Sequence, residues 1–138
     1  MIALPPVIEL TLAGVADSGV PNRERIILKS TQSVNIGQFG LLLAWKSGEN
    51  YVTPMADGFF WFGDQIIAPS TWVIVYTGSG TPQISKIPPN DEVACSVHWG
   101  RGMTIFNVPE IVPVLFRINE IIIGRHFHLP ASPPRLKQ

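Results

Sequence analysis

Five residues at positions 72–76, Trp-Val-Ile-Val-Tyr, form the run that most restricts what this chain folds into. All five are β-branched or aromatic, the residue types that strands favour. Because the run is apolar at every position, both of its faces need cover, and this predicts a strand in the middle of a sheet. Gly78 and Gly80 follow, and their backbone freedom ends the strand in a turn.

Short apolar or alternating runs recur along the rest of the chain, separated by glycine and proline. No window of a dozen residues has helical spacing with caps, whereas strands at intervals of about 8 to 12 residues are typical of a β-sandwich or barrel. The sequence therefore predicts an all-β fold of about eight or nine short, mostly antiparallel strands. We expect them at residues 8–12, 24–29, 34–37, 41–45, 51–53, 59–62, 72–76, 93–99 and 112–118.

The segments between these runs are expected to be irregular. Residues 54–58 contain proline and glycine and should separate two strands. The three prolines of residues 81–91 predict a loop. Residues 103–106 form a short element, and residues 112–118 and 120–123 are predicted to pair as a final hairpin. One domain is expected over residues 1–128, followed by a proline-rich tail at 129–138 that lacks the donors for a sheet.

Composition argues against several partner classes. Ten acidic and ten basic residues cancel, so no net field attracts the protein to nucleic acid or to a membrane surface. Charged residues make up only 14% of the chain, compared with roughly 25% in an average soluble domain. Two explanations stay open: an apolar surface patch that meets a partner, or a β-rich core beneath a polar but uncharged surface.

Targeting and redox signals are sparse. The longest apolar runs have about five residues, far short of the ~20 that span a bilayer. The first ten residues have no basic region and are interrupted by Pro5 and Pro6, so no signal peptide is expected. Cys95 is the only cysteine, which excludes an intrachain disulfide, leaves the compartment undetermined and slightly favours the cytoplasm. It lies in an apolar run and is expected in the core.

Several landmarks resemble, in order, those of the lamin-tail domain, an immunoglobulin-like β-sandwich found in nuclear lamins and in many bacterial proteins. The landmarks are the strand Glu24-Arg25-Ile26-Ile27-Leu28-Lys29, the turn Val34-Asn35-Ile36-Gly37-Gln38-Phe39, the segment from Phe60-Trp61-Phe62 to Ile67-Ala68-Pro69, the strand and glycine turn at 72–80, and Val97-His98-Trp99-Gly100-Arg101-Gly102 with Phe106-Asn107. The resemblance covers roughly residues 24–124 and implies an immunoglobulin-like fold and an interaction module.

Three departures indicate a divergent member. Gln38-Phe39 stands where the family usually has Gly-Trp, and Ser70 follows Pro69 where glycine is usual. The usual polar turn before the last hairpin is replaced by Val108-Pro109-Glu110-Ile111. These differences weaken the transfer of any particular partner.

The sequence gives little support for a catalytic site or a metal site. His126 and His128 would share one side of an extended chain, yet His98 is the only further histidine for a metal site. Cys95 and His98 are three apart on a strand and face opposite sides, so they form no catalytic pair. The carboxylates considered for acid–base chemistry all lie in expected turns: Asp57, Asp64, Asp91, Glu92 and Glu110. The sequence predicts no cofactor, no metal and no enzymatic activity.

Aromatic residues carry the functional hypothesis. Phe59, Trp61 and Trp99, with Arg101 beside Trp99, are the residues we expect in a binding surface. The competing interpretation is that alternate aromatics simply fill the core. Arg23, Arg25, Lys29 and Arg101 are scattered among acids, which argues against nucleic acid. The expected function is a non-catalytic module that docks a protein or a second copy of itself, with carbohydrate binding through the same aromatics as the alternative.

Overall fold

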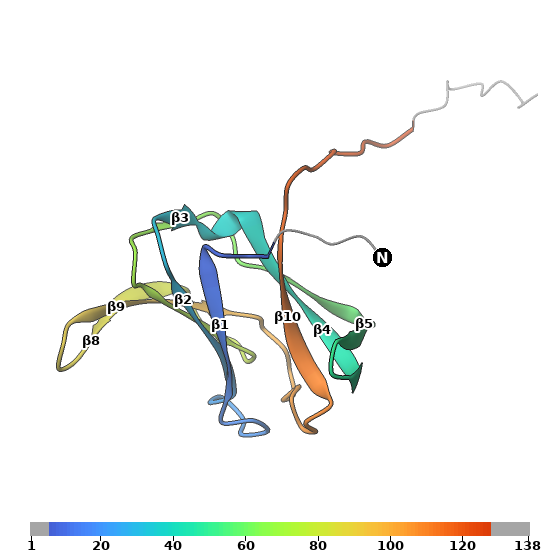
Figure 1. Ribbon diagram of the computed structural model, residues 1–138, viewed down its shortest axis with the longest axis horizontal. Coiled ribbons are helices and arrows are strands. Elements are labelled where there is room, and N and C mark those ends of the chain that lie inside the picture. The colour runs from blue at the N-terminus through green and yellow to red at the C-terminus, as the bar shows by residue number, and fades with distance from the viewer. Residues whose placement is uncertain (1–5, 128–138) are drawn as a thin grey trace, which may run out of the picture.

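In a computed structural model of the chain, residues 6–127 are described, and the predicted tail at 129–138 and His128 lie outside them. The described part is built from strands and one short 3-10 helix (Figure 1). Their bounds are β1 Leu10–Ala16, β2 Arg25–Ser30, β3 Val34–Asn35, the 3-10 helix Ile36–Gln38, β4 Phe39–Gly48, β5 Tyr51–Trp61, β6 Ile66–Ile67, β7 Trp72–Tyr76, β8 Gln83–Ile87, β9 Glu92–His98 and β10 Ile111–Arg117.

The strands form a five-stranded sheet, ordered β1-β2-β7-β9-β8, a three-stranded sheet, ordered β10-β4-β5, and the small pair β3-β6. The all-β prediction is confirmed, with ten strands within residues 6–127 where eight or nine were expected. Among the described residues six of the seven pairings are antiparallel, and β7 with β9 is the parallel one. β7 is the middle strand of the larger sheet, as its uniform β-forming composition predicts.

The core lies between the two large sheets. Val73 and Val75 of β7 face inward together with Ile26 and Leu28 of β2, and they meet Leu41 and other residues of the smaller sheet in one cluster. All five are fully buried. Cys95 opposes Val73 in the β7–β9 register and is buried with it, so its predicted place in the core is confirmed.

Glu24 is a buried acid that joins distant segments. Its carboxylate accepts hydrogen bonds from the backbone N–H groups of Gly19, Ile105 and Phe106, at 2.8, 2.7 and 2.9 Å, and from the Thr77 hydroxyl at 2.8 Å. These bonds hold residues 103–106 against β2. The short element predicted there is not a strand, yet Ile105 and Phe106 are buried in the core.

Two predicted loops turn out to contain strands. β5 continues through residues 54–58, because Pro54 lies on an edge strand, where a missing N–H need not remove a ladder bond, and the register shift between Leu42 and Ala44 absorbs the irregularity. Asp57 there has a positive φ of 57°. β8 forms inside the proline-rich segment 81–91, with its prolines outside the strand, and pairs with β9 alone.

The predicted final hairpin is wrong. β10 pairs with β4, from Ile111 opposite Trp45 to Arg117 opposite Phe39, and residues 120–123 form no strand. The chain beyond β10, residues 118–127, leaves the sheets and projects away from them as an extended segment (Figure 1). We call this segment the C-terminal arm. No helix in the described part of the chain is long and apolar enough to cross a membrane.

Candidate functional site

The side of the sheet β10-β4-β5 that faces away from the core is apolar from strand to strand. Residues opposite each other in paired strands point to the same side of the sheet. The register therefore shows which residues of the three strands lie in one row on this face. The three rows are Phe116, Gly40 and Trp61; Val114, Leu42 and Phe59; and Val112, Ala44 and Pro54. We call these nine residues the outer face. None of them is charged, whereas Phe39, Leu41 and Leu43 between them on β4 point into the core.

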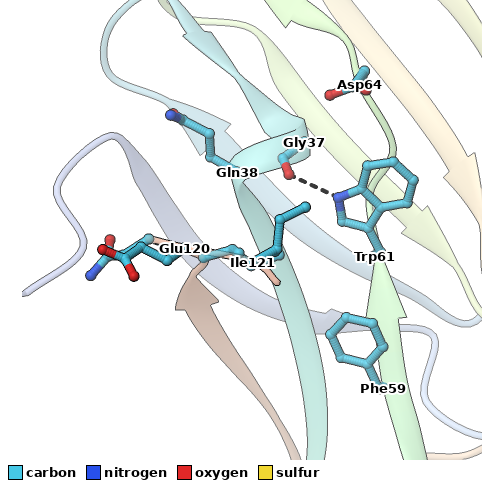
Figure 2. Close-up of a pocket in the computed structure, with 9 residues that line it drawn as sticks. Gly37, Gln38, Phe59, Trp61, Asp64, Glu120 and Ile121 are labelled. Atoms are coloured by element: carbon cyan, nitrogen blue, oxygen red, sulfur yellow. Dashed lines mark hydrogen bonds between the residues drawn. The ribbon is translucent and has the colours of Figure 1, made fainter. Parts of the chain in front are cut away.

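Two aromatic side chains stand out on this face. Phe59 is 52% exposed and Trp61 is 48% exposed, although both belong to a regular strand. The indole N–H of Trp61 donates to the Gly37 carbonyl at 2.8 Å, which fixes the orientation of the ring. Figure 2 shows both rings on β5, with the hydrogen bond to Gly37. Burying such rings against a partner is favourable because most of their surface is apolar.

Gly40 lets the flanking strands bring their aromatic rings together. Phe59 from β5 and Phe116 from β10 meet with ring centroids 5.6 Å apart across the central strand. A β-carbon at Gly40 would lie 2.8 Å from the Phe116 ring and 3.1 Å from the Phe59 ring. The missing side chain at Gly40 is therefore what allows this aromatic pair to cover the middle of the face.

A pocket opens at one end of the outer face, where the arm begins. Its volume is about 590 Å³, and its walls combine Phe59 and Trp61 with Gln38, Asp64 and residues 118–121 of the arm. The N–H of Ile118 donates to the Gln38 carbonyl at 2.6 Å, which anchors the first residue of the arm beside the pocket. Figure 2 shows Ile121 and Glu120 across from the two aromatic rings.

The four site residues expected from sequence do not form one patch. Phe59 and Trp61 lie on the outer face, while Phe60 opposes the core residue Leu41 and points the other way. Trp99 packs against Phe60 on that inner side, with ring centroids 5.2 Å apart. Arg101 lies there too, 6.0 Å from the Trp99 ring, and donates to the Asp57 carbonyl at 2.6 Å. The sheet therefore divides the set into two pairs, one on each side of β5.

Other residues of the outer face were not predicted from the sequence. Leu42, Val114 and Phe116 belong to runs that are apolar at every position, so alternation alone does not show which residues point outward. Glycine at position 40 gave no signal because it has no side chain to classify. The pairing of β4 with β10, about seventy positions apart in sequence, is what places these residues together.

The charged groups form local pairs rather than a reactive cluster. Glu92 accepts from the Trp72 indole at 3.0 Å and from Lys29 at 3.3 Å, and the indole hydrogen bond, helped by Lys29, lowers the pKa of Glu92. Arg25 pairs with Asp17 at 2.6 Å. Within residues 6–127, no group of three or more His, Cys, Asp or Glu side chains is placed to hold a metal ion.

The only cysteine is an unsuitable nucleophile. Burial raises the pKa of the Cys95 thiol, which keeps it protonated at neutral pH. Cys95 opposes Val73 on the core side of β9, whereas His98 opposes Tyr76 and stacks on its ring, with centroids 5.2 Å apart. The two side chains therefore face opposite sides of the sheet, as their spacing predicts.

Searches against protein-family models, curated proteins and solved structures found no significant match to this chain.

Proposed function

We propose that this chain is a non-catalytic interaction module that docks protein through the outer face of the sheet β10-β4-β5. The observation that carries the proposal is the composition of that face: three successive rows across three strands without a charged residue. Large contiguous apolar patches on a protein surface commonly mark sites of association. Interface centres are enriched in aromatic residues and depleted in charge, as here.

The proposal includes an immunoglobulin-like fold of lamin-tail type. The ordered landmarks of the sequence and the arrangement of a five-stranded sheet over a three-stranded one support this assignment. Lamin-tail domains are interaction modules, so the resemblance and the outer face lead to the same class of function. Fold alone does not determine function, and the argument for docking therefore rests on the face itself.

Charge favours protein over nucleic acid as the partner. Arg23 and Arg25 both lie near Asp17, and Lys29 pairs with Glu92, so acids offset these cations. A phosphate backbone needs clustered cations without competing carboxylates.

Solution mass across a concentration series, by sedimentation or light scattering, tests the proposal for self-association. Trp61→Ala should weaken association by about tenfold or more, because tryptophans at the centre of an interface often contribute the most binding energy. Trp45→Ala is the matched control: Trp45 is 45% exposed on the adjacent strand, but the register places it on the opposite side of the sheet. Unfolding curves should show that both variants are folded.

A monomer at every concentration would overturn self-association. An equal effect of Trp61→Ala and Trp45→Ala on association would show that the outer face is not the docking surface.

Carbohydrate binding is the second candidate, and the pocket is the observation that favours it. Aromatic rings beside carboxylate and amide groups suit a sugar, whose apolar face stacks while its hydroxyls are hydrogen-bonded. Gln38, Asp64, Asn119 and Glu120 supply such groups next to Trp61. A shift in tryptophan fluorescence on titration with glycans, at constant mass and lost in Asp64→Ala, would favour this function. No shift with any glycan would exclude it.

A further inference from the structure

The C-terminal arm exposes an unusual amount of apolar surface. Ile121, Ile122 and Ile123 are 74%, 95% and 86% exposed, and Phe127 is 86% exposed. Isoleucine is among the residues most often buried in folded proteins and among the strongest strand formers. Three in succession, apolar on both sides of an extended chain, are the pattern of a strand that needs cover on both faces. In the part of the chain that the structure describes, residues 118–127 belong to no strand.

The same chain has a free strand edge with apolar cover on both sides. Among residues 6–127, β5 is the last strand of its sheet, and the edge turned away from β4 has no neighbouring strand. Phe59 and Trp61 flank this edge on the outer side, and Phe60 with Trp99 flanks it on the inner side. The edge is interrupted at residues 55–58, where the register shifts and the Asp57 carbonyl accepts from Arg101, so residues 59–61 are the template for an incoming extended segment.

The arm does not pair with the edge of β5 in its own chain. Its first residue is held at Gln38 by the Ile118 hydrogen bond, and the chain after β10 runs away from the sheets (Figure 1). The root of the arm continues β10, which β4 separates from β5, and it faces Trp61 across the pocket at this end of the sheet. Two copies related by a two-fold axis near this pocket would each bring an arm to the other's β5, and one axis would satisfy both contacts.

We infer that the chain forms a homodimer in which residues 121–127 of each copy add as a strand to the free edge of β5 in the other copy. The inference rests on the proposed function, because it names the partner and the segment that cover the outer face. Seven extended residues span roughly 23 Å, so Ile121, Ile122 and Ile123 can lie along residues 59–61 of β5, which span roughly 10 Å. The isoleucines alternate between the two flanks, some meeting Phe59 and Trp61 and the others meeting the side of Phe60 and Trp99.

The first test changes the arm without touching the sheets. Ile122→Asp places a charge where the side chain is almost fully exposed, so the fold should be unaffected, and the dimer dissociation constant should rise at least tenfold. Ile84→Asp is the matched control, since Ile84 is an exposed isoleucine on β8 in the other large sheet. It should leave the dissociation constant within about threefold of the wild-type value, as expected for a surface change outside an interface.

The second test mixes two variants that are each defective on one side. Ile122→Asp retains an intact edge, and Trp61→Ala retains an intact arm, so a mixed dimer has one complete arm-to-edge contact. Fluorescence transfer between differently labelled copies should show mixed dimers at concentrations where each variant alone is monomeric. Homodimers held by contact of outer faces without the arms would give no such complementation.

The outcomes separate this inference from the proposed function. Dissociation by Trp61→Ala with no effect of Ile122→Asp would overturn the arm exchange and leave docking through the outer face standing. Dissociation by Ile122→Asp with no effect of Trp61→Ala would mean that the arm binds a surface other than the edge of β5. This result would overturn both the arm exchange and docking through the outer face. A wild-type chain that is monomeric throughout would overturn the arm exchange and the self-association together.

Discussion

The carboxylate of Glu24 accepts a hydrogen bond from the backbone N–H of Phe106, 82 residues further along the chain, at 2.9 Å. The carboxyl group is buried and also accepts from Thr77, Gly19 and Ile105. A carboxyl group loses its contacts with water on burial, and four donors at hydrogen-bond distance replace them. One side chain thus ties two loops and β7 to the start of β2.

Replacing this acid should be among the most destabilising single changes in the protein. Glu24→Ala leaves three backbone N–H groups and a hydroxyl without their acceptor, and each unsatisfied buried donor costs about 1–3 kcal/mol. We expect the free energy of unfolding to fall by more than about 3 kcal/mol in urea denaturation. The exposed Glu49→Ala is the control. A loss as small as that of the control would show that the carboxylate is dispensable.

Gly40→Ala tests how the outer face is built. The added β-carbon would meet the Phe116 ring at 2.8 Å and the Phe60 carbonyl at 3.0 Å, so strands or rings have to move. Overpacking of this kind costs about 1–3 kcal/mol, measurable by urea denaturation. Gly102→Ala is the matched control, because no atom lies within 4 Å of the β-carbon that it adds. Equal stability of the two variants would mean that the face repacks freely around position 40.

Glu9 and Arg117 predict a particular dependence of stability on pH. Arg117 hydrogen-bonds the Glu9 carboxylate through both Nε and Nη2, and mainly for this reason the pKa of Glu9 lies below its usual value of 4.5. A carboxyl group whose pKa is lower in the folded state stabilises the fold above its unfolded pKa, and this contribution is lost as the pH falls through the folded pKa.

The stability difference between wild type and Glu9→Gln should therefore be full at neutral pH and shrink below about pH 4.5, measured by denaturation at several pH values. Ionic screening should reduce the difference, because the pair is partly exposed. A difference that stays constant from neutral to acidic pH would contradict the role of the Glu9–Arg117 pair.

Cys95 should react with thiol reagents only when the protein opens. The side chain is buried against Val73, and burial raises the pKa of the thiol, so access and ionisation both oppose reaction. Labelling in native buffer should be at least tenfold slower than in denaturant, and in Glu24→Ala its rate should rise by the same factor as the equilibrium constant for unfolding. Rapid labelling of the native wild type would show that this part of β9 is accessible.

Local composition was enough to predict a strand where every residue of a run favours strand structure. The run at 72–76 is β-branched or aromatic throughout, and it is the middle strand β7. Alternation also describes residues 59–62, because Phe59 and Trp61, which we expected in a binding surface, are exposed while Phe62 is buried. In each case the information lies within a few neighbouring residues.

Strand pairing was not predictable in this way. Pro54 and the prolines of residues 81–91 signal breaks, yet an edge position tolerates a proline, and only the sheet order shows that β5 and β8 are edges. The segment 112–123 is apolar almost throughout, and nothing local distinguishes a hairpin from a strand that pairs with β4.

By itself, the sequence determined that this chain is all-β and where its middle strand runs, and it left open whether the aromatic residues near position 60 fill the core or reach the surface. Only the tertiary structure decided that Trp99 and Arg101 lie on the other side of the sheet from Trp61, and that Phe116 joins Phe59 across Gly40. The physical reason is that composition and alternation act between near neighbours, whereas the face a strand presents depends on its register with strands far away in the chain.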